Sequence, residues 1–88
     1  MPSVLTAEIS VDCRLRYLRV ANPSGGTTRT VTVQDAAGNL IDFATLAGGG
    51  YLEVEFPRPG ELVIGGIYWQ ASGAGLIGAI QAEPNSPA

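Results

Sequence analysis

Two glutamates at alternate positions come closest, by residue type and spacing, to a catalytic pair. Glu53 and Glu55 stand two residues apart in the run Tyr51-Leu52-Glu53-Val54-Glu55-Phe56. In an extended strand both carboxylates project from one face with their Cα atoms about 6.5 to 7 Å apart, near the separation of the paired acids of glycosidases. Such a pair needs a cleft that holds the sugar, and so small a chain has no evident insertion to build one. We therefore expect a solvated or ion-paired strand face rather than an active site.

Other chemically active residue types are scarce. The chain has no histidine, and its single cysteine is Cys13. No base stands beside this thiol, and the neighbouring carboxylate of Asp12 disfavours a thiolate, so we expect an inert packing residue. Asp35, Asn39 and Asp42 carry oxygen ligands, but their spacing does not fit a calcium loop and indicates turn chemistry instead. The sequence predicts a protein that is not an enzyme and that has no catalytic residue, no metal and no cofactor.

Arginine and aromatic side chains are the candidates for contact with a partner. Arg14 and Arg16 share one strand face, where they can pair with Glu53 and Glu55 across strands or across a subunit boundary, or stay solvated. Tyr68 and Trp69 are neighbours in a strand and point to opposite faces, so one is expected in the core and the other toward solvent or a partner. The candidate interface residues are Arg14, Arg16, Tyr51, Glu53, Glu55, Tyr68 and Trp69.

The elements that position these residues are predicted to be strands, because apolar and polar residues alternate through most of the chain. The pattern is clearest at 51–56, where Leu52, Val54 and Phe56 point inward. At 14–21, Leu18 and Val20 face one way and Leu15 and Tyr17 the other. Further strands are expected at 3–11, 30–35, 40–44, 62–72 and 76–83. Gly65-Gly66 predicts a bulge or bend inside the long run 62–72.

No stretch has a convincing helical period, and Gly, Pro and Asn clusters separate the runs. The sequence thus predicts an all-β fold, a small antiparallel β-sandwich or jelly-roll-like barrel of about seven strands. Residues 1–83 are expected to form one domain and residues 84–88 a flexible C-terminal tail.

Size and charge narrow the classes of partner. A chain of 88 residues with a net charge of −3 is a poor candidate for binding nucleic acid, since phosphate backbones are gripped by Lys and Arg. No segment is long and apolar enough to cross a bilayer, and the start lacks a secretory signal, so neither membrane contact nor secretion is expected. Because a domain this small is marginally stable alone and has no disulfide partner for its cysteine, we expect it to associate with other chains.

Several segments between about residues 14 and 82 follow one another in a distinctive order. They are Arg14-Leu15-Arg16-Tyr17-Leu18-Arg19-Val20-Ala21-Asn22, Gly25-Gly26, Thr30-Val31-Thr32-Val33, Leu46-Ala47-Gly48-Gly49-Gly50-Tyr51-Leu52-Glu53-Val54 and Ile67-Tyr68-Trp69-Gln70-Ala71-Ser72-Gly73. Taken in this order, they resemble small β-sandwich proteins of tailed bacteriophage virions. Where members of that group place a V-P-A-G turn early, this chain has Ser10-Val11-Asp12-Cys13.

The resemblance implies a non-enzymatic virion component. The leading hypothesis is a capsid decoration or cement protein, a homo-oligomer and most simply a trimer, that docks on the major capsid protein or another virion protein. It would be made in the host cytoplasm and located in the virion. A part of the head–tail or tail apparatus is an alternative. Another is a glycan- or receptor-binding module that uses an exposed Tyr51, Tyr68 or Trp69.

Overall fold

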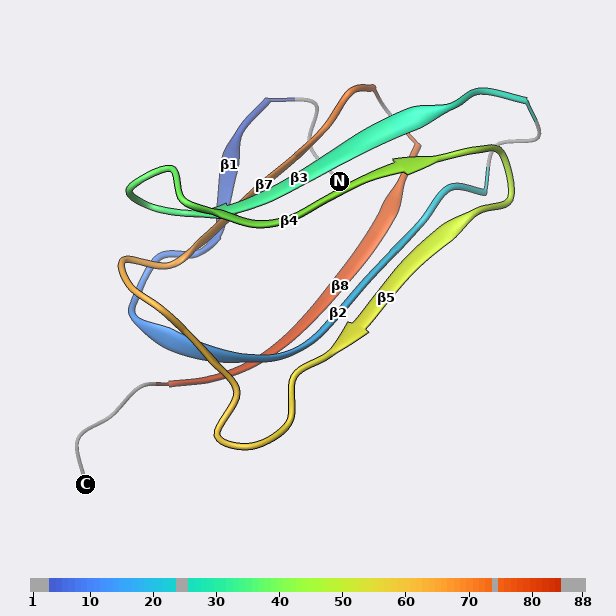
Figure 1. The fold of residues 1–88 in the computed structure, drawn as a ribbon. Coiled ribbons are helices and arrows are strands. Elements are labelled where there is room, and N and C mark those ends of the chain that lie inside the picture. Colours follow the sequence, from blue (N-terminus) through green and yellow to red (C-terminus); the bar gives the residue numbers. More distant parts are fainter. Residues whose placement is uncertain (1–3, 24–25, 74, 85–88) are drawn as a thin grey trace.

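The fold is two antiparallel sheets packed face to face (Figure 1). The computed structural model describes residues 4–23, 26–73 and 75–84, so the expectation of a flexible tail falls largely outside the described residues. The strands are β1 (Thr6–Ile9), β2 (Cys13–Ala21), β3 (Arg29–Asp35), β4 (Leu40–Leu46), β5 (Tyr51–Glu55), β6 (Glu61–Val63), β7 (Ile67–Ala71) and β8 (Ile77–Pro84). The described residues contain no helix, which confirms the predicted all-β class.

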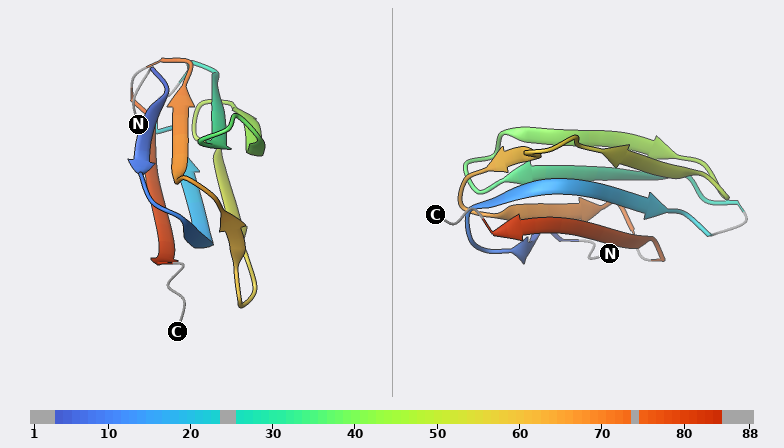
Figure 2. Two further views of the ribbon diagram at one scale, coloured as in Figure 1. Left: turned by 90° about the vertical axis from the view of Figure 1, so that its left-hand side faces the viewer. Right: turned by 90° about the horizontal axis from the view of Figure 1, so that it is seen from below.

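Sheet A has the strand order β1-β7-β3-β4. In sheet B the central strand is β2, which pairs with β8 on one side and with β5 and then β6 on the other. The two views of Figure 2 show the sheets as two layers whose strands lie roughly along one common axis. The edges of sheet A are therefore β1 and β4, and those of sheet B are β8 and the β5–β6 side.

The core is a single layer of apolar side chains between the sheets. Its fully or almost fully buried members include Leu15, Leu18 and Val20 from β2 and Val31 and Val33 from β3. The side chains of Ile67, Trp69 and Ala71 from β7 complete its centre. Because inward and outward residues alternate on these strands, the remaining side chains lie on the outer faces of the two sheets.

A bulge at Arg16 changes the register expected for β2. Its pairing with β8 shifts between Leu15 and Tyr17. One extra residue reverses the inside–outside alternation, so Leu15 and Leu18 both face the core. The prediction that Leu15 faces the same way as Tyr17 was therefore wrong. The bulge also leaves Arg16 and Tyr17 both half-exposed on the surface of sheet B.

The long run 62–72 is two strands rather than one, which gives eight strands in place of about seven. Gly65 and Gly66 have φ values of 82° and 108° and lead the chain from β6 in sheet B to β7 in sheet A. A Cβ on Gly66 would come within 2.8 Å of the Ile9 carbonyl carbon and of Ser10 Cα. Both the left-handed backbone and the close approach thus require glycine.

The first strand is shorter than the expected 3–11. It ends at Ile9, and Val11 is exposed. The Asp12 side chain accepts a hydrogen bond of 2.6 Å from the Gly65 amide. This bond ties the β1–β2 connection to the β6–β7 connection.

One buried polar side chain closes the opposite end of the sandwich. Asn22 is 1% exposed, and its amide nitrogen donates to the carbonyl oxygens of Thr27 at 2.7 Å and Leu46 at 3.1 Å. The Asn22 backbone carbonyl oxygen accepts a hydrogen bond from the Gly49 amide, and the Asn22 backbone amide donates one to the Gly50 carbonyl oxygen. Asn22 therefore joins the β2–β3 and β4–β5 connections, a role that sequence reasoning had reduced to turn formation.

Candidate functional site

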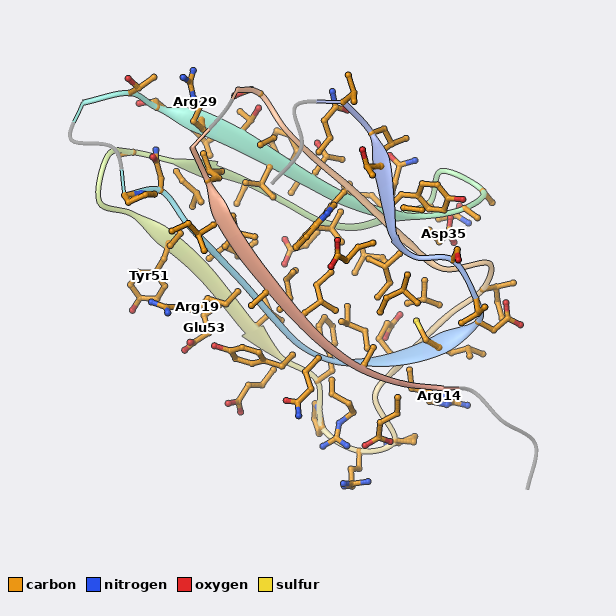
Figure 3. All side chains as sticks on the ribbon, turned by 180° about the vertical axis from the view of Figure 1, so that it is seen from behind. Arg14, Arg19, Arg29, Asp35, Tyr51 and Glu53 are labelled. Atoms are coloured by element: carbon orange, nitrogen blue, oxygen red, sulfur yellow. The ribbon has the colours of Figure 1, made fainter. Side chains whose placement is uncertain are left out.

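The outer face of sheet B brings together five of the seven candidate residues. Tyr51, Glu53 and Glu55 project from β5, and Arg14 and Arg16 belong to the adjacent β2. Figure 3 shows Tyr51, Arg19 and Glu53 grouped at one end of the sandwich and Arg14 toward the other. Most of the candidates therefore share one surface, although their contacts differ from those expected.

Arg19, which sequence reasoning did not single out, is the centre of the group at the Tyr51 end. Its guanidinium carbon lies 5.4 Å from the centroid of the Tyr51 ring, a cation–π distance. Its Nε lies 3.7 Å from Glu53 Oε2. The Tyr17 hydroxyl donates to the same oxygen at 2.7 Å. This hydrogen bond to a carboxylate is the main reason that the pKa of Tyr17 is raised above its ordinary value.

The second group on this face centres on Glu83 of β8. Glu83 Oε1 lies 3.0 Å from Arg16 Nη1 and 3.6 Å from Arg58 Nη1. Arg16 Nε also donates to the Phe56 carbonyl oxygen at 3.3 Å. These residues border a surface depression of about 480 Å³, whose lining also includes Tyr17, Glu55, Pro57 and Gln81. Its walls carry charges of both signs.

Of the alternatives for Arg14 and Arg16, pairing with Glu53 and Glu55 across strands is not formed among the described residues. The β2–β5 register places Arg19 opposite Glu53 and Tyr17 opposite Glu55. Arg16 instead reaches Glu83 on the other side of β2. Within the described part of the chain, Arg14 and Glu55 make no ion pair. The strand pairing that decided this was not visible in the sequence.

Tyr68 and Trp69 do point to opposite faces, as predicted. Trp69 is only 5% exposed and belongs to the core, so the prediction that it is a candidate interface residue was wrong. Its indole N–H finds no acceptor among the described residues. Tyr68 is half-exposed on the outer face of sheet A, away from the other candidates.

Cys13 and Asp35 behave as the sequence indicated. Burial first, and the Asp12 carboxylate second, raise the pKa of the Cys13 thiol. Asp35 accepts hydrogen bonds from the backbone amides of Ala37 and Asn39 and from the Asn39 side chain. These bonds lower the pKa of Asp35 and hold the β3–β4 hairpin. Within 4–23, 26–73 and 75–84 no three acidic or cysteine side chains gather as metal ligands.

Large exposed apolar side chains gather at the edges of the sheets. Over the described ranges, none of them lies on the central strands β2, β3 or β7. They are Val4, Leu5, Val11, Leu40, Phe43, Tyr51, Leu62, Ile64 and Ile77, all on edge strands or in the residues next to them. On the open side between β4 and β6, Leu40 and Leu62 line a groove of about 270 Å³ with Ile41, Phe56 and Val63.

Comparison of the chain with protein-family models, with curated proteins and with solved structures gave no match. The described residues also include no helix with the length and hydropathy to span a membrane. The fold and its surfaces are therefore the ground on which a function is proposed.

Proposed function

We propose that this chain is a non-enzymatic structural protein of a tailed bacteriophage virion, a decoration protein that self-associates and docks on a larger shell. The observation that carries the proposal is the placement of the exposed apolar side chains along the sheet edges. Soluble β-proteins usually protect their edges with charge, proline or cover, because an open edge recruits other chains. Apolar edges are suited to a protein whose working state is an assembly.

The groove between β4 and β6 is the surface that we assign to self-association. Leu40 and Leu62 are 61% and 43% exposed there, one on an edge of each sheet. A second copy seated in the groove would cover both edges together. The outer sheet faces suit this role less well, because the one on sheet B carries alternating charges.

The charge around this groove favours a ring over a two-fold dimer. Asp35 and Glu61 belong to its lining. A two-fold axis at the groove would place these carboxylates near their copies, whereas a ring sets each groove against a different surface of the next copy. The resemblance to virion sandwich proteins also favours a ring, namely a trimer. It further implies that the second partner is a capsid shell.

Light scattering coupled to size exclusion tests self-association. The wild-type chain is expected to elute as a trimer, and Leu62→Lys as a monomer with an unchanged circular dichroism spectrum. Thr28→Lys, which adds the same charge in the exposed β2–β3 connection, serves as the matched control and should remain a trimer. A wild-type protein that is monomeric over a wide concentration range contradicts the proposal.

Docking on a shell needs a separate measurement. Tailed particles purified by density gradient from the source that encodes the chain should contain it in a fixed ratio to the major capsid protein, as measured by peptide mass spectrometry. Antibody labelling seen by electron microscopy should fall on the head. Labelling confined to the tail would replace decoration by the tail role, and particles without the chain would overturn the virion assignment.

A further inference from the structure

The groove between β4 and β6 is acidic as well as apolar. Asp35 and Glu61 are the charged residues of its lining, and no arginine is among them. Neither carboxylate forms an ion pair within the described residues. The exposed side chains of Leu40 and Leu62 lie in the same lining. A surface that complements this groove therefore carries a cation next to apolar side chains.

A second copy of this chain can supply that cation only from an arginine side chain. The five basic residues of the sequence are all arginines, and the chain has no histidine. Three of them, Arg16, Arg19 and Arg58, are already engaged in ion pairs within their own copy. Arg14 and Arg29 form no ion pair among the described residues. The cation for the groove is therefore one of these two.

Arg29 lies at the other end of the sandwich from the groove. It begins β3 and Asp35 ends it, so about 20 Å of strand separates the two residues. Figure 3 shows them at opposite ends of the molecule. A Cβ on Gly73 would come within 2.6 Å of Arg29 Cζ, so the guanidinium packs against the Gly73 backbone. A partly buried cation held in place without a carboxylate is suited to receive one from outside.

Exposed apolar side chains accompany Arg29 at its end of the sandwich. The Ser72 amide donates to the Thr30 carbonyl oxygen at 2.9 Å, which joins the end of β7 to the residue next to Arg29. Leu5 directly precedes β1, and β1 is antiparallel to β7, so this exposed side chain also lies toward the end of β7. Ile77, which is 66% exposed, begins β8 just after the β7–β8 connection. We call Leu5, Arg29 and Ile77 the cationic end.

Arg14, the other unpaired arginine, occupies a different position. It lies opposite Leu62 of β6 and so borders the groove of its own copy. Its entry into a neighbour's groove would bring two grooves together around a two-fold axis. The proposed ring needs a cation on a surface away from the groove, and Arg29 meets this requirement.

From the complementary charges and the apolar side chains on both surfaces, we infer that the cationic end of one copy docks in the groove of the next, with Arg29 paired to Glu61. The inference rests on the proposed self-association and names the surface that meets the groove. Asp35 already accepts three hydrogen bonds in its own hairpin, whereas Glu61 has no polar partner among the described residues. A guanidinium can give a carboxylate two parallel hydrogen bonds. The same contact, repeated head to tail, closes a ring.

Charge reversal, followed by light scattering coupled to size exclusion, tests this contact. Arg29→Glu and Glu61→Arg should each turn the trimer into a monomer, because each change sets like charges against one another. The double variant with both changes restores opposite charges and should recover the trimer. Arg14→Glu, the same change at the other unpaired arginine, is the matched control and should remain a trimer. Thr28→Lys keeps the positive sign of the cationic end, so its expected assembly is unchanged.

Three results would overturn this contact while leaving self-association through the groove in place. They are a trimer in both Arg29→Glu and Glu61→Arg although Leu62→Lys is a monomer, a double variant that does not recover the trimer, or dissociation in Arg14→Glu but not in Arg29→Glu. A wild-type chain that is monomeric overturns the proposed self-association and this contact together. Circular dichroism of each variant separates lost assembly from lost folding.

Discussion

The side-chain amide of Asn22 lies 3.1 Å from the carbonyl oxygen of Leu46, and this hydrogen bond connects the end of β2 in sheet B to the end of β4 in sheet A. The same nitrogen donates to Thr27 at 2.7 Å. Because Asn22 is buried, its hydrogen bonds have no competing water. One side chain thus fixes the spacing of the two sheets at this end.

Replacing Asn22 by alanine should therefore lower the free energy of unfolding by about 1 to 3 kcal/mol, since the buried carbonyl of Leu46 and the partly buried carbonyl of Thr27 lose their donor. Urea unfolding followed by tryptophan fluorescence measures the loss. Thr28→Ala, in the same connection but exposed, is the control and should stay within about 0.5 kcal/mol of wild type. Equal stability of both variants would contradict the role given to Asn22.

Gly66 should tolerate substitution far less well than Gly49, although both have positive φ values. Alanine at Gly49, where the new Cβ meets nothing within 4 Å, carries only the backbone cost of about 1 kcal/mol. Alanine at Gly66 must also displace the Ile9 carbonyl, and this displacement would pull β1 away from β7. We expect a much larger fall in melting temperature for Gly66→Ala. Similar melting temperatures would show that β1 can move at little cost.

Acid should weaken the β3–β4 hairpin through Asp35. Its hydrogen bonds to Asn39 and Ala37 lower its pKa from the ordinary 3.8, so the folded state favours the ionised form. The stability that Asp35 contributes is complete when the pH is above the ordinary pKa of 3.8, and it is lost as the pH falls through the lower pKa of the folded state. Asp35→Asn should thus show a smaller drop in melting temperature between pH 7 and low pH than wild type. Asp42→Asn, on the neighbouring strand, provides the comparison, and an equal acid response of both variants would count against Asp35.

Alkali should lower the stability of the fold through Cys13, whose pKa is raised rather than lowered. Burial raises its pKa above the ordinary 9.0, so stability is complete below that value and decreases as the pH rises through the folded-state pKa. Cys13→Ala should remove this part of the alkaline loss and leave the part due to Tyr17. In the native wild-type protein the thiol should react with a disulfide reagent much more slowly than in urea. Rapid native labelling would place Cys13 at the surface.

The sequence was sufficient where one strand face is plainly apolar, and insufficient where geometry depends on a distant strand. Leu52 and Val54 alternate with exposed Tyr51 and Glu53 as predicted, because a shift by one would bury carboxylates. The bulge at Arg16 depends on how β8 pairs with β2, and no local signal marks it. Asn22 looked like a turn residue because its acceptor on Leu46 is 24 positions away.

The same reasoning explains the candidate site. Residue types correctly directed attention to Tyr51 and Glu53, but their shared contact, Arg19, follows from the β2–β5 register. Trp69 was considered for the surface because adjacent residues of a strand cannot be assigned to inside or outside without knowing the layer that covers them. The outer face of sheet A depends in turn on the order β7-β3-β4, which places residues from three separate segments side by side.

Strand order also determines when each sheet can form as the chain leaves the ribosome. Sheet A lacks its bridge between β1 and β3 until β7 has been made, and one side of β2 has no partner strand until β8 follows. Sheet A can therefore close only after β7, and sheet B only after β8, has left the exit tunnel. With contacts so distant in sequence, folding is expected on a timescale of about milliseconds to seconds.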